Sequence, residues 1–94
     1  MIVVRGVYRA KYGRGDDLVQ LFKEGKILWP NMRFRLLTDL SGPFFTVVTE
    51  AEYENLSAWE AEARVFSDSR FPAWFERMIP LVESGQREFY NLVD

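Results

Sequence analysis

The stretch IVVRGVYRAK (residues 2–11) predicts the first element of the fold, because its side chains alternate between two faces. One face carries Ile2, Val4, Gly6, Tyr8 and Ala10. The other carries Val3, Arg5, Val7, Arg9 and Lys11. A period of two residues predicts a β-strand. Because both faces carry apolar residues, we expect this strand to be covered on both sides.

A helix is predicted after this strand. YGRG (residues 12–15) breaks the strand, Asp16 is the expected N-cap, and Pro30 ends the helix because its ring lacks the amide hydrogen. The apolar residues between them recur at spacings of three and four, which places them on one helical face. These residues are Leu18, Leu21, Phe22, Gly25, Leu28 and Trp29.

A hairpin follows, because residues 31–40 alternate again and SGP (residues 41–43) turns the chain into FFTVVTE (residues 44–50). From Asn55 the period becomes helical. Leu56, Trp59, Ala63 and Phe66 form one stripe, and Ser57 and Glu60 have capping-box spacing. SDS (residues 67–69) is predicted to break or bend this helix.

A further helix is predicted by a second stripe, which contains Phe71, Trp74, Phe75, Met78 and Val82. Pro80 should kink or end it, and Gly85 is the expected C-cap. Residues 86–93 are the expected last strand. We interpret ARVFSDSRFPAWFERM (residues 63–78), at the centre of this region, either as a core-facing stripe or as one wall of an apolar cavity.

The order β-α-β-β-α-β predicts one α+β domain over residues 1–94, a ferredoxin-like fold with a four-stranded antiparallel sheet and helices on one face. The uncovered face is expected to meet a second copy, which gives a homodimer in the form of a dimeric α+β barrel. Four arginines are assigned to that face: Arg5, Arg9, Arg33 and Arg35. They either pair with Glu50, Glu88 or Asp39 or bind an anion.

The composition excludes several classes of function. The chain has no cysteine and no histidine, so it lacks a disulfide, a thiolate nucleophile and the commonest metal ligand and acid-base group. We expect no metal and no cofactor. The net charge of −2 disfavours nucleic-acid binding. No apolar run is long enough for a membrane span, and we expect a mature, soluble, cytoplasmic protein.

Two stretches carry a resemblance to known families. TEAEYENLSAWEAEARVF (residues 49–66), a strand, an acidic turn and a helix with leucine and tryptophan three apart, resembles the dimeric α/β-barrel superfamily, nearest to the antibiotic biosynthesis monooxygenase group. The motif Tyr8-x-x-Lys11-x-Gly13 is similar to the NIPSNAP branch, although Gly6 stands where that branch usually has arginine.

The resemblance implies site residues. In cofactor-free monooxygenases of this superfamily an asparagine and a tryptophan four residues apart line the substrate cavity, which nominates Asn55 to hydrogen-bond a substrate oxygen and Trp59 to shape the pocket. Asn55 as an N-cap and Trp59 as core are the alternatives. Arg77 or Arg70 is expected to supply positive charge. The haem-degrading branch needs a histidine, and this chain has none.

The aromatic residues predict an apolar cleft between sheet and helices. We expect a small hydrophobic or aromatic ligand to contact Trp29, Phe34, Phe66 and Phe75 there, beside Trp59. The predicted function is that of a cofactor-independent monooxygenase acting on an aromatic or polyketide-like molecule. The alternative is a non-catalytic small-molecule-binding or interaction module on the same barrel.

Overall fold

The computed structural model describes all 94 residues. The main elements are β1 (Ile2–Ala10), α1 (Gly15–Leu28), β2 (Arg35–Thr38), β3 (Thr46–Tyr53), α2 (Leu56–Glu62), α3 (Phe71–Met78) and β4 (Val82–Asn91). Two short 3-10 helices, η1 (Ala63–Ser67) and η2 (Ile79–Leu81), follow α2 and α3. The strands form one sheet in the order β2-β3-β1-β4, and all neighbours are antiparallel. This confirms the ferredoxin-like α+β fold.

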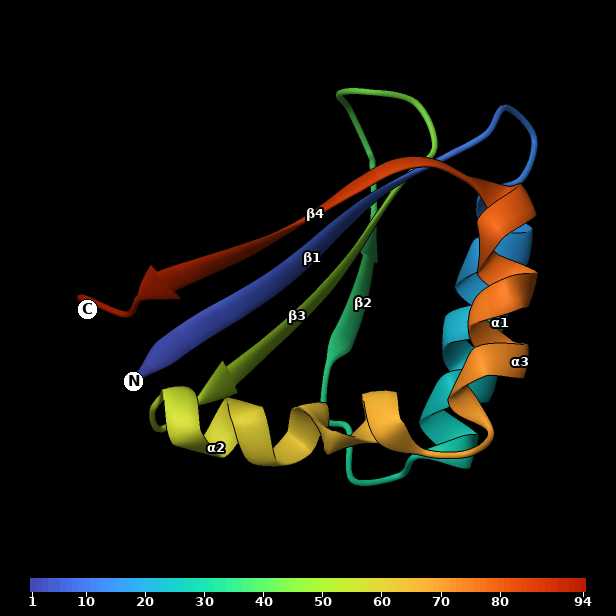
Figure 1. Ribbon diagram of the computed structural model, residues 1–94. Helices are drawn as coiled ribbons and strands as arrows, with labels where there is room; N and C mark the ends of the chain where they lie inside the picture. The colour runs from blue at the N-terminus through green and yellow to red at the C-terminus, as the bar shows by residue number, and fades with distance from the viewer.

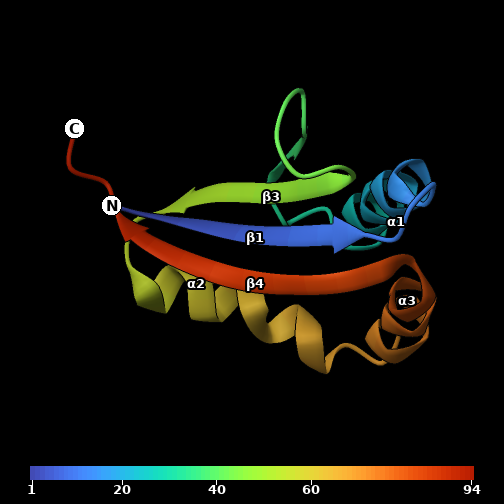
Figure 2. The ribbon, with the colours of Figure 1, turned by 90° about the horizontal axis from the view of Figure 1, so that it is seen from above.

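The helices leave one face of the sheet bare (Figures 1 and 2). Helices α1 and α3 lie side by side at one end of the sheet, and α2 lies near the opposite end, where both chain termini are found. The chain between α2 and α3 bends along the 3-10 helix η1. None of the helices is long and apolar enough to cross a membrane.

The core lies between α1, α3 and the near end of the sheet. Its buried members are Ala10, Leu18, Leu21, Phe22, Trp29, Val47, Trp74, Met78 and Leu81. Trp74 joins the two helices, because its indole Nε1 donates a hydrogen bond to the Leu21 carbonyl at 3.0 Å. Burial of this large ring with its polar atom paired makes Trp74 a principal contact between α1 and α3.

The bare face carries the charged half of β1. Arg5 lies opposite Glu50 on β3, and Arg35 of β2 lies opposite the same residue. The Arg5 Nε atom is 3.3 Å from a Glu50 carboxylate oxygen, and Arg35 also pairs with that carboxylate. Two of the four predicted arginines therefore share one acid of their own chain. Arg9 lies 4.0 Å from Glu83.

Arg33 does not belong to this row, which corrects the sequence-based assignment. It precedes β2 in the loop after α1, and its backbone N–H donates to the Glu62 carboxylate at 3.1 Å. The strand predicted over residues 31–40 is accordingly shortened to Arg35–Thr38. The reason is that α1 must first be linked to the sheet edge, which uses the residues after Pro30 as a connection.

The caps and boundaries also differ from the prediction. Arg14, not Asp16, occupies the N-cap position of α1, and Asp16 lies in the first turn, where its negative charge suits the helix dipole. At α2 the Asn55 side chain accepts a hydrogen bond from the Ala58 N–H at 2.9 Å. Ser57 is therefore inside the helix and does not form the predicted capping box.

Gly85 is not a helix C-cap. Helix α3 ends at Met78, and β4 already begins at Val82, so Gly85 lies within the strand opposite Tyr8. A Cβ atom at Gly85 would lie 3.2 Å from Cδ1 of the Tyr8 ring. The glycine thus gives the tyrosine ring room to lie against the sheet.

Candidate functional site

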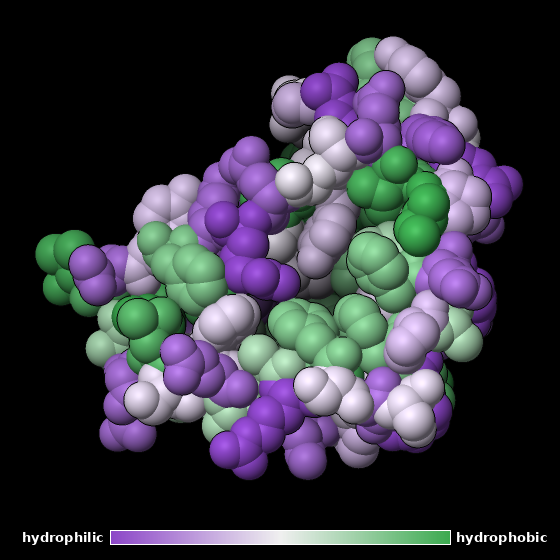
Figure 3. All heavy atoms as spheres, viewed as in Figure 1, coloured by the Kyte–Doolittle hydropathy of each residue, from purple (hydrophilic) through white to green (hydrophobic).

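A cavity of about 590 Å³ lies between the helix-covered face of the sheet and the helices. Sixteen of its 22 lining residues are hydrophobic, so it suits a molecule with large apolar faces. Figure 3 shows hydrophobic side chains gathered around a hollow on this side of the molecule. The five aromatic residues that the sequence assigned to a cleft all line it: Trp29, Phe34, Trp59, Phe66 and Phe75.

Phe71, at the start of α3, connects the rings of the cavity wall. Its ring centroid lies 5.2 Å from Phe66, 5.7 Å from Trp74 and 5.8 Å from Phe75. Trp29 of the α1 C-terminus lies 5.9 Å from the same ring. These tilted, edge-on and stacked arrangements are those that aromatic pairs favour. The wall is therefore a connected set of rings.

Residues 63–78 contribute to both core and cavity. Trp74 and Met78 are each only 8% exposed and belong to the core, whereas Phe66 and Phe75 are 44% and 41% exposed. Both interpretations of this stretch therefore apply: all four residues line the cavity, and the two buried ones also belong to the core. The division arises because η1 bends the chain, so that Phe66 approaches from another direction than the rings of α3.

Trp59 lies on α2 beside the last strand. Its ring meets the Phe89 ring edge-on at 5.0 Å, which fixes α2 against β4. The guanidinium carbon of Arg87 lies 5.3 Å from the Trp59 ring centroid and 5.4 Å from that of Phe66. Arg87 also lines the cavity. A positive charge is thus held against two aromatic rings at the cavity wall.

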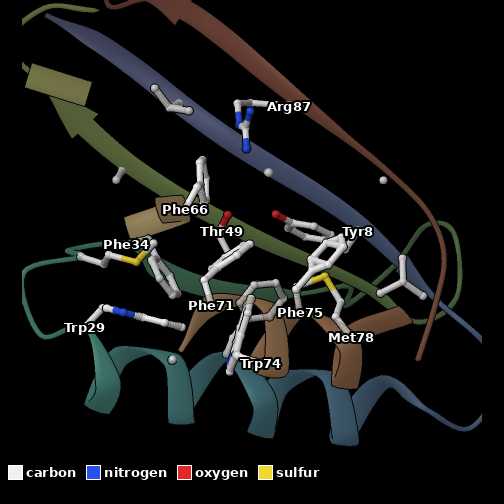
Figure 4. A pocket seen from close by; sticks show the side chains of 18 of the residues that line it. Tyr8, Trp29, Phe34, Thr49, Phe66, Phe71, Trp74, Phe75, Met78 and Arg87 are labelled. Carbon is white, nitrogen blue, oxygen red and sulfur yellow. The ribbon is translucent and has the colours of Figure 1, made fainter. Parts of the chain in front are cut away.

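The other polar groups of the cavity include two hydroxyls, those of Tyr8 on β1 and Thr49 on β3. Figure 4 shows them on the sheet side of the cavity, with Arg87 above them. Burial raises the pKa of Tyr8, and the positive charge of Arg87 offsets only part of this rise. The Tyr8 hydroxyl therefore stays protonated at neutral pH and can donate a hydrogen bond.

Tyr53 lies at another edge of the cavity, with Glu62 as its neighbour. Burial raises the pKa of Tyr53, and the neighbouring Glu62 carboxylate raises it further. One Glu62 oxygen accepts the Arg33 backbone N–H, and the other oxygen is buried without a hydrogen-bond partner. Of the two, Tyr53 is the one that lines the cavity.

Asn55 and Arg77, the two other residues nominated for catalysis, lie outside the cavity lining. The exposed Asn55 side chain caps α2. The Arg77 guanidinium pairs with Glu24 at 2.6 Å, because that side of α3 faces α1. Arg70, the other arginine considered, pairs with Asp68 at 2.9 Å and holds the pKa of that carboxyl well below its usual range. Only Trp59 of the nominated set reaches the cavity.

Arg87 was not among the residues nominated from the sequence. The alternation of residues 86–93 places Arg87 and Phe89 on one face of the last strand, which was the available signal. The helical pattern of α2 and α3 does not show that this face meets Trp59. No cluster of three or more His, Cys, Asp or Glu side chains arranged to hold a metal ion occurs in the structure.

Comparison with known proteins identifies relatives by fold. No family model matches the sequence, and no curated protein matches it. Among solved structures, an uncharacterized NIPSNAP domain protein from Burkholderia xenovorans is 24% identical, with a TM-score of 0.84 over 99% of this chain and 95% of that chain. A NIPSNAP family protein from Agrobacterium tumefaciens is 21% identical, with a TM-score of 0.86 over 99% of this chain and 86% of that chain.

A candidate antibiotic biosynthesis monooxygenase from Nitrosomonas europaea is also similar in fold. It is 18% identical, and the match covers 100% of both chains with a TM-score of 0.72. The chain therefore has the ferredoxin-like fold found in NIPSNAP proteins and in candidate antibiotic biosynthesis monooxygenases, which confirms the predicted likeness at the level of the fold. The two NIPSNAP structures superpose with the higher scores.

Proposed function

We propose that the protein binds a flat aromatic small molecule in this cavity and oxidises it with dioxygen, as a cofactor-independent monooxygenase. The observation that carries the proposal is the cavity of about 590 Å³, whose wall is a connected set of aromatic rings with a few polar groups on the sheet side. Such a cavity complements the faces of a polycyclic or polyketide-like molecule. Trp29, Phe34, Phe66 and Phe75 are the proposed ligand contacts, beside Trp59.

The proposed chemistry requires little from the protein. An electron-rich phenol, once deprotonated, can give an electron to dioxygen directly. For an anthrone-like substrate, the ring methylene loses two hydrogens and becomes a carbonyl, while the second oxygen atom leaves as water, so the four electrons taken up by dioxygen come from that carbon. The protein then has to stabilise the substrate anion and exclude bulk water.

Binding without turnover is the second candidate. It is favoured by the positions of Asn55 and Arg77, because the residues that the superfamily resemblance nominates for catalysis do not lie together with Trp59 in the cavity. A protein of this kind would carry or sequester the same class of molecule. The ligand chemistry would be unchanged.

Oxygen consumption tests the first candidate, and calorimetric titration tests the second. A panel of anthrone-like and naphthol-like phenols is offered to the wild type, to Phe66→Leu and to Trp59→Ala. We expect Phe66→Leu to weaken binding with little loss of stability, and Trp59→Ala to weaken both, because Trp59 also packs against Phe89. Heat of binding without oxygen uptake would select the binding role, and neither signal across the panel would refute both.

We also propose that the protein forms a homodimer through the bare face of the sheet. Val7 lies beside Val48 on this face, and Leu37 lies beside Val48 on the other side, so an apolar strip crosses three strands. The charges that border it are largely neutralised, since Arg5 and Arg35 share Glu50. Two such faces packed together would bury this strip with few unpaired charges.

A further inference from the structure

We infer that the cavity contains an oxyanion site, formed by the guanidinium of Arg87 and the hydroxyls of Tyr8 and Thr49. The inference rests on the proposed binding function and adds the chemical class of the ligand. The ligand is an aromatic molecule that carries a negatively charged oxygen, as a carboxylate or a phenolate. The rings hold its faces, and the oxyanion site holds its charged end.

Strand register places the site. Gly6 on β1 lies opposite Thr49 on β3 and opposite Arg87 on β4, so the three residues form one row across the sheet. Residues of one row point to the same face of a sheet, and here that face lines the cavity. The middle position has no side chain. The space over Gly6 is therefore taken up by the side chains of neighbouring residues.

The two hydroxyls converge on this space. A Cβ atom at Gly6 would lie 2.7 Å from the Thr49 hydroxyl oxygen and 3.0 Å from the Tyr8 hydroxyl oxygen. Neither hydroxyl has a hydrogen-bond partner of its own among the side-chain hydrogen bonds of the protein. The Tyr8 ring edge also covers this point, since its Cε2 atom would lie 2.8 Å from the same Cβ. A ligand oxygen would therefore lie on the cavity side of the two hydroxyls, which are both free to donate to it.

Arg87 supplies the charge. It forms no salt bridge, in contrast to Arg5, Arg35, Arg70 and Arg77, which each pair with a carboxylate. The rings of Trp59 and Phe66 hold it in place through their faces, which leaves its N–H donors available. A planar guanidinium with free donors matches the geometry of a carboxylate. Figure 4 shows its tip directed toward the side of the cavity that carries Tyr8 and Thr49.

The protonation of Tyr8 fits this role. Its raised pKa keeps the hydroxyl neutral, so it does not repel an anion and can donate a hydrogen bond to it. The ring of Tyr8 is fixed from behind by Phe22, at a centroid distance of 5.0 Å. The site therefore consists of donors on rigid elements, which is how a binding site gains selectivity for an oxyanion.

Calorimetric titration with paired probes tests the inference. The charged probes are 2-naphthoate and the phenolate of 2,4-dinitro-1-naphthol, and the neutral probe is 2-acetylnaphthalene, which is close in shape to 2-naphthoate. We expect Arg87→Gln to weaken binding of the charged probes about 10- to 100-fold, the usual size of a hydrogen bond to a charged group, and to change the neutral probe less than about twofold. Arg14→Gln, at an exposed arginine outside the cavity, removes the same charge as a control.

Three further variants keep the test independent of any loss of folding. Tyr8→Phe and Thr49→Val each remove one hydroxyl and keep the shape, so each should weaken charged probes by about fivefold to tenfold. Gly6→Ala should abolish selectivity for charged probes, because its methyl group would collide with Tyr8 and Thr49 and displace both hydroxyls. Thermal melting confirms that each variant is folded before it is titrated.

The outcomes separate this inference from the proposed function. Binding of all three probes with the same affinity in wild type and Arg87→Gln would overturn the oxyanion site and leave the aromatic cavity as a binding site. Binding of 2-naphthoate but not of the phenolate, lost in Arg87→Gln, would confine the ligand class to carboxylates. Failure of every probe to bind the folded wild type would overturn the binding function and the oxyanion site with it.

Discussion

The two faces of the sheet use the same strand in different ways. On the helix-covered face, β1 presents Val4, Tyr8 and Ala10 to rings from the helices, and the packing is incomplete enough to leave a cavity. On the bare face, the same strand presents Arg5 and Val7 to neighbours on β3, and the charges are paired within the chain. Period-two alternation thus separates the side chains that line the cavity from those on the bare face, although the two sets are only one residue apart in the sequence.

The difference shows how a short chain divides its apolar residues. The covered face cannot bury every ring, because α2 and α3 meet the sheet at different ends and η1 bends between them (Figure 1). The bare face has no helix over it, and its strands carry mainly valine, leucine and charge, with the Tyr90 ring opposite Val3. The cavity therefore lies on one side of the sheet, and the paired charges lie on the other.

The largest expected effect comes from the covered face. Trp74→Ala should lower the free energy of unfolding by about 3 to 5 kcal/mol, because it opens a large hole in the core and leaves the Leu21 carbonyl without its indole partner. Chemical denaturation measures the change. Trp74→Phe retains part of the ring and should cost less. Equal losses for Phe75→Ala and Trp74→Ala would contradict the division between core and cavity wall.

A substitution on the bare face should weaken dimer assembly, not the folding of the single chain. Val7→Lys places a charge in the apolar strip and should raise the dimer dissociation constant at least about tenfold, which corresponds to about 1.4 kcal/mol. Sedimentation velocity over a range of concentrations measures it. Val93→Lys makes the same change at a residue that is 93% exposed and serves as the control. A wild type that sediments as a monomer of 11.1 kDa at every concentration would refute the dimer.

A smaller effect is expected at Asn55. Asn55→Ala should cost about 1 kcal/mol of stability through the lost cap on the Ala58 N–H, and should leave probe binding unchanged. Asn55→Asp keeps an acceptor at the cap and should restore stability. If both substitutions abolish oxygen consumption while thermal melting stays normal, Asn55 takes part in catalysis although it lies outside the cavity lining. That outcome would contradict a role for Asn55 as a helix cap alone.

The smallest effect concerns the bend before α3 and depends on pH. Arg70 lowers the folded-state pKa of Asp68 below its ordinary value of 3.8, so the pair stabilises the fold above that value and loses this contribution as the pH falls through the lower folded-state pKa. The difference in melting temperature between wild type and Asp68→Asn should therefore shrink between pH 7 and about pH 2. A difference that is constant across this range would show that the pair is not coupled to folding.

Much of the fold followed from periodicity alone. The alternation of residues 2–11 and the stripe of α1 are long and regular, so they identified β1 and its covering helix. Gly85 was misassigned because a glycine after a helical stripe is typical of a C-cap, while its actual requirement is the Tyr8 ring on the neighbouring strand. That requirement depends on strand pairing, which local sequence does not specify.

The candidate site was predictable only in its apolar part. Aromatic residues such as Trp29 and Phe66 can be assigned to the cavity from their residue type alone, because large apolar side chains concentrate between the sheet and the helices. Arg87 has no such signal, since its neighbours Gly6 and Thr49 come from two other strands. Arg77 was nominated instead because the resemblance implies an arginine near the cavity, but its side of α3 meets Glu24.

The placement of the tryptophans has a spectroscopic consequence. The chain has three tryptophans, and Trp29, Trp59 and Trp74 all line the cavity. The tryptophan fluorescence of the protein, excited selectively at the red edge of indole absorption, therefore originates from the cavity wall. A flat aromatic guest that absorbs at the emission wavelengths of indole would quench all three emitters at once, whereas a molecule bound to the bare face of the sheet would leave them largely unchanged. The tryptophan fluorescence of the unlabelled protein should thus report whether the cavity is occupied.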